Sequence, residues 1–179
     1  PETIQPSNQK PSNLPTFQPS NPLQNMLVII PTYNERENAE AIVRAVFALP
    51  EGFHILIVDD GSPDGTADIV RGLQQDFPDR LHLLERRGKL GLGTAYIAGF
   101  QWGLERHYAY FFEMDADFSH DPNDLRRLLA KCRDEGADVA VGSRYVRSGH
   151  VENWPLDRIV LSYGASLYTR LILWMPVAD

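Results

Sequence analysis

Short apolar runs alternate along the chain with longer segments in which apolar residues recur every three or four positions. The runs at 27–30 and 54–58 are rich in Ile, Leu and Val, which is typical of strands buried on both faces. By this reasoning the sequence predicts strands at residues 27–30, 54–58, 81–84, 108–114 and 137–141.

Helical spacing follows each of the first four runs. After the first run, Asn34 with Glu37 resembles a capping box, and apolar residues recur from Ala39 to Phe47. Later helices are expected around Ile69, Val70 and Leu73, across residues 94–106, and from Asp121-Pro122 through Leu125, Leu128 and Leu129. Because strands and helices alternate, the sequence predicts an α/β fold, an open and mostly parallel sheet with helices on both faces.

The first 25 residues have a different composition. They hold six of the 13 prolines, interleaved with Ser, Asn and Gln, and such a segment buries too little apolar surface to offset its ordering entropy. We therefore expect a disordered, proline-rich tail at 1–25 and one folded domain at 26–179.

Charge and cysteine content exclude several classes of protein. With 24 acidic and 17 basic residues, the net charge of -7 lacks the surplus cations of a general nucleic-acid binder. A single cysteine, Cys132, excludes a disulfide framework and a cysteine metal site. No stretch reaches the roughly 20 apolar residues that span a membrane, so the chain as given is expected to be soluble.

Acidic residues follow three of the predicted strands. Glu35 lies past the first strand, Asp59 and Asp60 past the second, and Asp115 and Asp117 past the fourth. In an open parallel sheet, ligands bind at the carboxyl ends of the strands. This convergence predicts a site at that edge of the sheet.

Asp115 and Asp117 are two residues apart where a buried strand ends. Hard carboxylate oxygens there suit Mg²⁺ or Mn²⁺, which prefer one or two carboxylates together with substrate phosphates. A solvated acidic loop is the alternative, but an exposed loop does not require the apolar run at 111–114 before it. A metal at this place would neutralise charge on a departing diphosphate, so a nucleotide diphosphate sugar is a sensible donor.

Two further segments can be interpreted in more than one way. A Pro-Asp-Gly turn and a helix cap at Thr66 explain residues 62–66, but they do not explain the adjacent Asp59 and Asp60, which could bind a base or ribose. The segment 88–94 begins a GxG pattern, but Tyr96 stands where the third glycine of a dinucleotide site belongs. The sequence thus disfavours a dehydrogenase.

Arginines follow the last predicted strand. Arg144 lies at the expected ligand edge, with Arg147 and Arg158 after it, and guanidinium groups suit bidentate phosphate binding. Surface arginines in a polar loop are the alternative, chiefly for Arg147.

Taken together, five motifs resemble the dolichyl-phosphate (polyprenyl-phosphate) mannose synthases, which are inverting family-2 glycosyltransferases. The motifs are residues 31–35 (PTYNE), 59–66 (DDGSPDGT), 88–96 (GKLGLGTAY), 114–120 (MDADFSH) and 142–145 (GSRY). The resemblance runs from about Met26 to the last residue, and it implies the nucleotide-diphospho-sugar transferase (GT-A, Rossmann-like) fold.

The resemblance also implies a role for each matching residue. The guanosine pocket would be lined by Pro31, Tyr33, Glu35, Val58 and Asp60, and the diphosphate and metal would be faced by Met114, Asp115, Ala116 and Asp117. Asp115 and Asp117 would be metal ligands, and Ser119 stands where some relatives have a third ligand, a glutamine. Arg144 would bind phosphate or sugar, and Arg158 the phosphate of the acceptor, so Asp117, Arg144 and Arg158 are the candidate catalytic residues.

The reaction so implied transfers mannose from GDP-mannose to a polyprenyl (dolichyl-type) monophosphate, with inversion and with Mg²⁺ or Mn²⁺. A phosphate monoester carries about -1.5 to -2 charges at neutral pH, so it needs no general base. The resemblance places the protein in the cytoplasm, peripherally at the cytoplasmic face of a membrane. Family members continue past an aspartate like Asp179, which suggests a truncated C-terminal end, with a missing segment or a membrane-anchoring partner.

Other interpretations stay open. A family-2 transferase with another nucleotide sugar or a glycan hydroxyl acceptor would need a carboxylate base, for which Asp157 is the candidate. A truncated chain could also bind a nucleotide sugar without transferring it. The apolar and aromatic segment at 159–175 fits either an interfacial helix that meets the lipid acceptor or an ordinary core helix.

Overall fold

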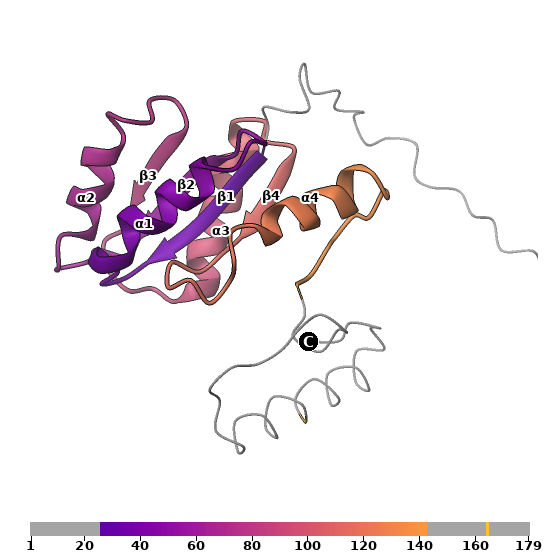
Figure 1. The fold of residues 1–179 in the computed structure, drawn as a ribbon. Coiled ribbons are helices and arrows are strands. Elements are labelled where there is room, and N and C mark those ends of the chain that lie inside the picture. The colour runs from indigo at the N-terminus through magenta and orange to yellow at the C-terminus, as the bar shows by residue number, and fades with distance from the viewer. Residues whose placement is uncertain (1–25, 143–163, 165–179) are drawn as a thin grey trace, which may run out of the picture.

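The computed structural model describes residues 26–142 and 164, and within them four strands and four helices alternate (Figure 1). The strands are β1 (Met26–Thr32), β2 (His54–Asp59), β3 (Leu81–Glu85) and β4 (Tyr110–Glu113). The helices are α1 (Arg36–Phe47), α2 (Thr66–Leu73), α3 (Leu92–Glu105) and α4 (Asp124–Arg133). No helix in this described part is long and apolar enough to cross a bilayer.

The four strands form one parallel sheet in the order β3-β2-β1-β4. β1 lies in the interior of the sheet, where Val28 is in register with Ile55 on one side and with Phe112 on the other. A strand that is covered on both faces must be apolar at every position, which explains the continuous run that begins at Met26.

Helices cover both faces of the sheet, as the sequence predicted. On one face, α1, α2 and α4 pack against the side chains of Val28, Ile30 and Ile57. On the other face, α3 packs against Leu27, Ile29 and Leu56. The chain therefore has the predicted α/β architecture, with neighbouring positions of β1 buried in two separate core clusters.

Two glycines let α3 approach β1 closely. A Cβ atom built on Gly99 would lie 2.6 Å from Cγ2 of Ile29, and one on Gly103 would overlap the ring of Phe111. These glycines are four residues apart, so they share one face of the helix. The close packing of α3 on the sheet therefore requires that neither position 99 nor position 103 carries a side chain.

The predicted strand at 137–141 was wrong, because these residues form no strand. Val139 and Val141 are 77% and 55% exposed, and the described sheet ends at β4 on that side. A strand is stable only where its backbone groups pair with a neighbour. The alternating apolar pattern of residues 137–141 indicated a strand, but a local pattern cannot show whether a neighbouring strand is present to pair with it.

The capping box predicted at Asn34 and Glu37 is also absent. α1 starts after Glu35, and no side chain of its own caps it. Asn34 has a left-handed backbone with φ of 60°, and its N–H donates to Oγ of Ser62. The preceding loop is thus held by a distant segment, which a local sequence pattern cannot indicate.

Several predictions concern residues outside the described part of the chain. They are the disordered tail at 1–25, the segment at 159–175, and the roles of Arg144, Arg147, Asp157 and Arg158.

Candidate functional site

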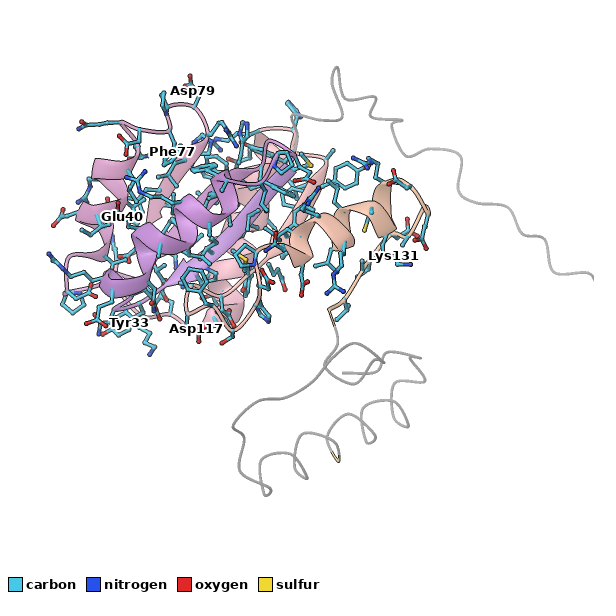
Figure 2. The ribbon with its side chains drawn as sticks, viewed as in Figure 1. Tyr33, Glu40, Phe77, Asp79, Asp117 and Lys131 are labelled. Carbon is cyan, nitrogen blue, oxygen red and sulfur yellow. The ribbon has the colours of Figure 1, made fainter. Side chains whose placement is uncertain are left out.

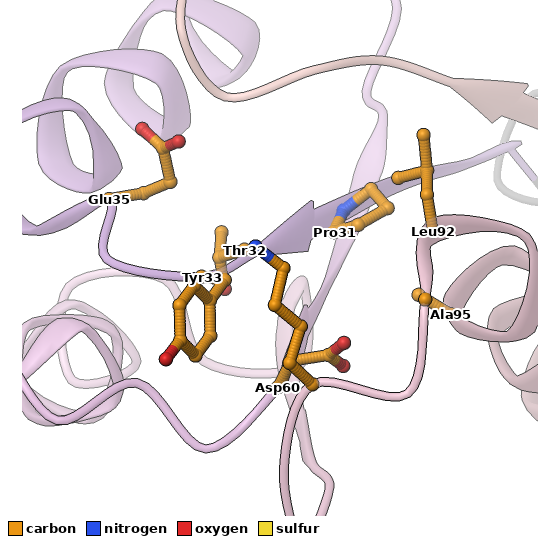
Figure 3. A pocket seen from close by; sticks show the side chains of 9 residues that line it. Pro31, Thr32, Tyr33, Glu35, Asp60, Leu92 and Ala95 are labelled. Atoms are coloured by element: carbon orange, nitrogen blue, oxygen red, sulfur yellow. The ribbon is translucent and has the colours of Figure 1, made fainter.

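The carboxyl ends of β1 and β2 open onto a pocket with a volume of about 160 Å³ (Figure 3). Its wall consists of Pro31, Thr32, Tyr33, Glu35, Asp60, Lys89, Gly91, Leu92 and Ala95. In open α/β sheets, ligands bind outside the carboxyl ends of the strands. Because pockets for drug-sized ligands usually measure about 300 Å³ or more, these residues would contact only part of a nucleotide.

Four residues that the resemblance assigned to a guanosine pocket meet here: Pro31, Tyr33, Glu35 and Asp60. The fifth, Val58, is fully buried in the core cluster under α3 and is not part of the pocket wall. Sequence reasoning did not assign Lys89, Gly91 or Leu92 to a site. The signal was present, since all three belong to the glycine-rich segment at 88–96.

Asp60 lies on the pocket wall in a buried ion pair with Arg86. Nε and Nη2 of Arg86 donate to the two carboxylate oxygens over 2.6 and 2.7 Å, and the side chains are only 10% (Arg86) and 9% (Asp60) exposed. The pair forms because Asp60 follows β2 and Arg86 follows the neighbouring β3. Arg86 also donates to Oγ1 of Thr94, so it ties the pocket to the start of α3.

The neighbouring Asp59 has a structural role, because it holds the loop after β2 together. Its carboxylate accepts hydrogen bonds from Oγ1 of Thr32 at 3.0 Å and from the N–H and hydroxyl of Ser62. Only 1% of Asp59 is exposed. The two adjacent aspartates therefore have different positions: Asp59 holds the loop together from inside, and Asp60 lies on the pocket wall.

The loop after β2 positions the loop that carries Tyr33 and Glu35. The N–H groups of Asn34, Glu35 and Arg36 donate to Ser62, Thr66 and Asp64, over 3.0 to 3.1 Å. The hydroxyl and N–H of Thr66 donate in turn to Asp64, which lowers the pKa of that carboxyl. Thr66 is the first residue of α2, and Gly65, rather than Thr66, is the N-cap. The hydroxyl of Thr66 also accepts the hydrogen bond from Glu35 in the loop after β1.

Asp115 and Asp117 follow β4 at the same edge of the sheet, where Figure 2 labels Asp117. Met114 and Ala116 are 1% and 3% exposed and belong to the core, whereas Asp115 is half-buried and Asp117 exposed. This alternation anchors the segment and leaves both carboxylates outside the core. The side chains of Met114 and Ala116 are therefore anchors, and their predicted contact with a diphosphate is untested.

Each of the two carboxylates has a partner. The hydroxyl of Tyr96 on α3 donates to Oδ1 of Asp115 over 3.4 Å, and Asp115 raises the pKa of that tyrosine together with burial, which is the larger cause. Ser119 donates to Asp117 through its hydroxyl and through its N–H, the latter over 2.9 Å, and these bonds lower the pKa of Asp117. These hydrogen bonds therefore fix the orientation of the Asp117 carboxylate.

The donor set fits Mg²⁺ or Mn²⁺ in part. Carboxylate oxygens are the hard ligands that these cations take beside substrate phosphates and water. Within residues 26–142, no group of three His, Cys, Asp or Glu side chains is placed to hold a metal. Ser119 is bonded to Asp117 in this structure, and its predicted role as a metal ligand is untested.

Comparison with known proteins shows the family of this chain. The model of the glycosyl transferase family 2 matches residues 27–176. A polyprenol monophosphomannose synthase of Mycolicibacterium smegmatis is 54% identical over 88% of this chain and 59% of its own length. An undecaprenyl-phosphate mannosyltransferase of Micrococcus luteus is 48% identical over 86% of this chain and 62% of its own length.

A solved structure has the same fold. A crystal structure of residues 1–349 of S. aureus TarS in complex with UDP matches 64% of this chain and 33% of its own, with a TM-score of 0.52 and 21% identity. The names of the sequence relatives confirm the resemblance to polyprenyl-phosphate mannose synthases, although the chain spans only about 60% of their length. Because the family model covers most of the chain, the protein belongs to glycosyl transferase family 2.

Proposed function

We propose that this chain carries the donor site of a polyprenyl-phosphate mannosyltransferase, which transfers mannose from GDP-mannose to a polyprenyl monophosphate with inversion. One observation carries the proposal: the pocket at the ends of β1 and β2 and the Asp115/Asp117 pair after β4 share one edge of the sheet. The names of the relatives at 54% and 48% identity support mannose and a lipid phosphate as substrates.

The pocket would bind the nucleoside of the donor. Tyr33 is 37% exposed and offers an aromatic face to a base, and Glu35 and Asp60 offer carboxylate oxygens. Guanine presents N–H donors on one edge, which suit such acceptors. Oδ1 and Oδ2 of Asp60 already accept three hydrogen bonds, from Arg86 and from the N–H of Leu90, so few lone pairs are left for the base.

Asp115 and Asp117 would hold a divalent metal, Mg²⁺ or Mn²⁺. Such an ion, when bound, supplies positive charge that stabilises a departing diphosphate. Tyr96 donates a hydrogen bond to Asp115, and the N–H of Ser119 donates one to Asp117, so contacts within the chain position both carboxylates.

The acceptor would react without a general base, because a phosphate monoester is already an anionic nucleophile at neutral pH. We assign its binding to Arg144 and Arg158, which lie outside the described residues. A lipid acceptor implies a site of action at a membrane surface, where the protein would be peripheral. Attack at the anomeric carbon with loss of GDP inverts the configuration in one step.

The test is incubation of the chain with GDP-mannose, Mg²⁺ or Mn²⁺, and a short polyprenyl phosphate. Asp117→Ala should lower the rate by about a hundredfold or more if the metal stabilises the leaving group. Asp68→Ala is the control, since Asp68 is an exposed residue of α2 that pairs with Arg71. Intact GDP binding without any product would instead show a nucleotide-sugar binding module, and the transfer proposal would fail for this chain.

A further inference from the structure

Lys89 covers the aromatic face of Tyr33 in the pocket. Its Nζ lies 4.6 Å from the centre of the Tyr33 ring, and both residues belong to the pocket wall. An ammonium over a ring face at this distance is a cation–π contact, and such contacts are weak at exposed sites. The side chain of Lys89 is exposed, so it can leave the ring at little cost.

The backbones on both sides of this contact are held in place. The N–H of Leu90, the next residue, donates to Oδ2 of Asp60 over 3.3 Å, and Nη2 of Arg86 reaches the carbonyl of Gly91. On the other side, the residue after Tyr33 is bonded to Ser62. The flexible side chain of Lys89 can therefore change its position without a change in either backbone.

Charge gives this lysine a further property. Of the residues that line the pocket, Lys89 is the one cation, and it makes no ion pair within residues 26–142. The nearby guanidinium of Arg86 is already bonded through two nitrogens to Asp60. A phosphate that enters the pocket would thus find one uncommitted positive charge.

A nucleoside diphosphate brings two groups that act on this contact in opposite ways. A base that stacks on the face of Tyr33 covered by Lys89 would compete with the ammonium for that surface. Its phosphates attract the ammonium, since a charge-assisted hydrogen bond to phosphate is stronger than an exposed cation–π contact. Binding therefore favours a lysine that exchanges the ring for a phosphate.

On the basis of the function proposed above, we propose that Lys89 is an exchange residue of the nucleotide site: it covers Tyr33 in the free protein and moves to the phosphates when the base stacks on that ring. Lys89 thereby selects nucleoside diphosphates over nucleosides. A nucleoside must displace the lysine from the ring and gains no phosphate contact in return.

The experiment measures the binding of GDP and of guanosine by calorimetry, with Mg²⁺ present. Lys89→Met should weaken GDP by about tenfold and leave guanosine equal or tighter, because one charge-assisted contact is lost and the ring is freed. Lys89→Arg should keep GDP affinity within about threefold, because the positive charge remains. Lys131→Met is the matched control on α4, where that lysine pairs with Glu135, and it should change neither affinity.

A second background tests the exchange itself. In Tyr33→Leu, the ring is absent, so Lys89→Met should still weaken GDP but should no longer favour guanosine. An equal loss of GDP and guanosine in Lys89→Met would indicate a structural role and overturn the proposal, as would unchanged affinity for GDP. If the unmodified chain does not bind GDP at all, the proposed function itself fails.

Discussion

At the scale of single residues, the ion pair between Arg86 and Asp60 is the interaction of the site whose loss should destabilise the fold most. Both side chains are about nine-tenths buried, and a charge left there without its partner is costly. Sequence reasoning assigned Asp60 to the pocket but missed Arg86, because nothing in the local pattern distinguishes it from Arg87. Only the parallel pairing of β2 with β3 brings Arg86 beside Asp60.

Replacing Arg86 tests this pair. Arg86→Met should destabilise the fold by about 3–5 kcal/mol, because it leaves the carboxylate of Asp60 buried and unpaired. Urea denaturation measures the change. Arg71→Met is the control: Arg71 pairs with Asp68 and Glu85 at the surface, and exposed pairs contribute about 0–1 kcal/mol. A loss at Arg86 no larger than that at Arg71 would contradict the assignment.

At the scale of the elements, the contact of α3 with β1 depends on Gly99. Gly99→Ala should cost about 1–3 kcal/mol, because the added methyl group overlaps Ile29 and overpacking outweighs the better helix propensity of alanine. Gly72→Ala in α2 meets no atom within 4 Å and should be neutral or stabilise by up to about 1 kcal/mol. Thermal unfolding of the two variants gives the comparison, and equal effects would exclude close packing as the cause.

His54 on β2, His82 on β3 and Tyr108 in the loop between α3 and β4 form a cluster of polar aromatic side chains. The hydroxyl of Tyr108 lies 2.8 Å from Nδ1 of His54 and 3.4 Å from Nε2 of His82. Burial is the main cause that lowers the pKa of both histidines, and it raises the pKa of Tyr108 to about 12. His54 also faces Arg80 and Asp79, and His82 faces Arg106 and Asp79.

This cluster predicts a dependence of stability on pH. Because the folded pKa of each histidine lies below its unfolded value of about 6.5, the unfolded chain binds more protons in that interval. The free energy of unfolding should therefore be at its full value above about pH 6.5 and should fall as the pH drops through the lowered pKa values. The double variant His54→Gln/His82→Gln should flatten this slope when urea unfolding is measured across the pH range, and an unchanged slope would contradict the assignment.

At the scale of the whole molecule, the pocket and the Asp115/Asp117 pair would act on two parts of one donor. Removal of divalent metal with EDTA should weaken GDP by about tenfold or more, because the diphosphate loses its cation, and should leave guanosine unchanged. Calorimetry with and without Mn²⁺ measures the difference. An equal effect on both ligands would mean that the metal supports the fold rather than the diphosphate.

The sequence alone established the order of four strand and helix units, because apolar spacing of two kinds is written locally along the chain. It also located Glu35, Asp60, Asp115 and Asp117 at strand ends, since parallel strands bring those ends to one edge. The wrong strand at 137–141 shows the limit of local patterns: pairing depends on a neighbour that periodicity does not reveal.

Only the tertiary structure showed which of the acidic residues at the strand ends support the loops and which line the pocket. Asp59 and Asp60 are adjacent and chemically identical. Yet Asp59 accepts hydrogen bonds from Thr32 and Ser62 inside the loop, whereas Asp60 pairs with Arg86 and lies on the pocket wall. Likewise, the loop after β2 is hydrogen-bonded to the loop after β1, although the bonded residues are 28 and 31 positions apart in the sequence. Such a contact forms only when the fold brings distant segments together. Local chemistry thus determined which groups are present at the site, and packing of distant segments determined which of them a ligand can reach.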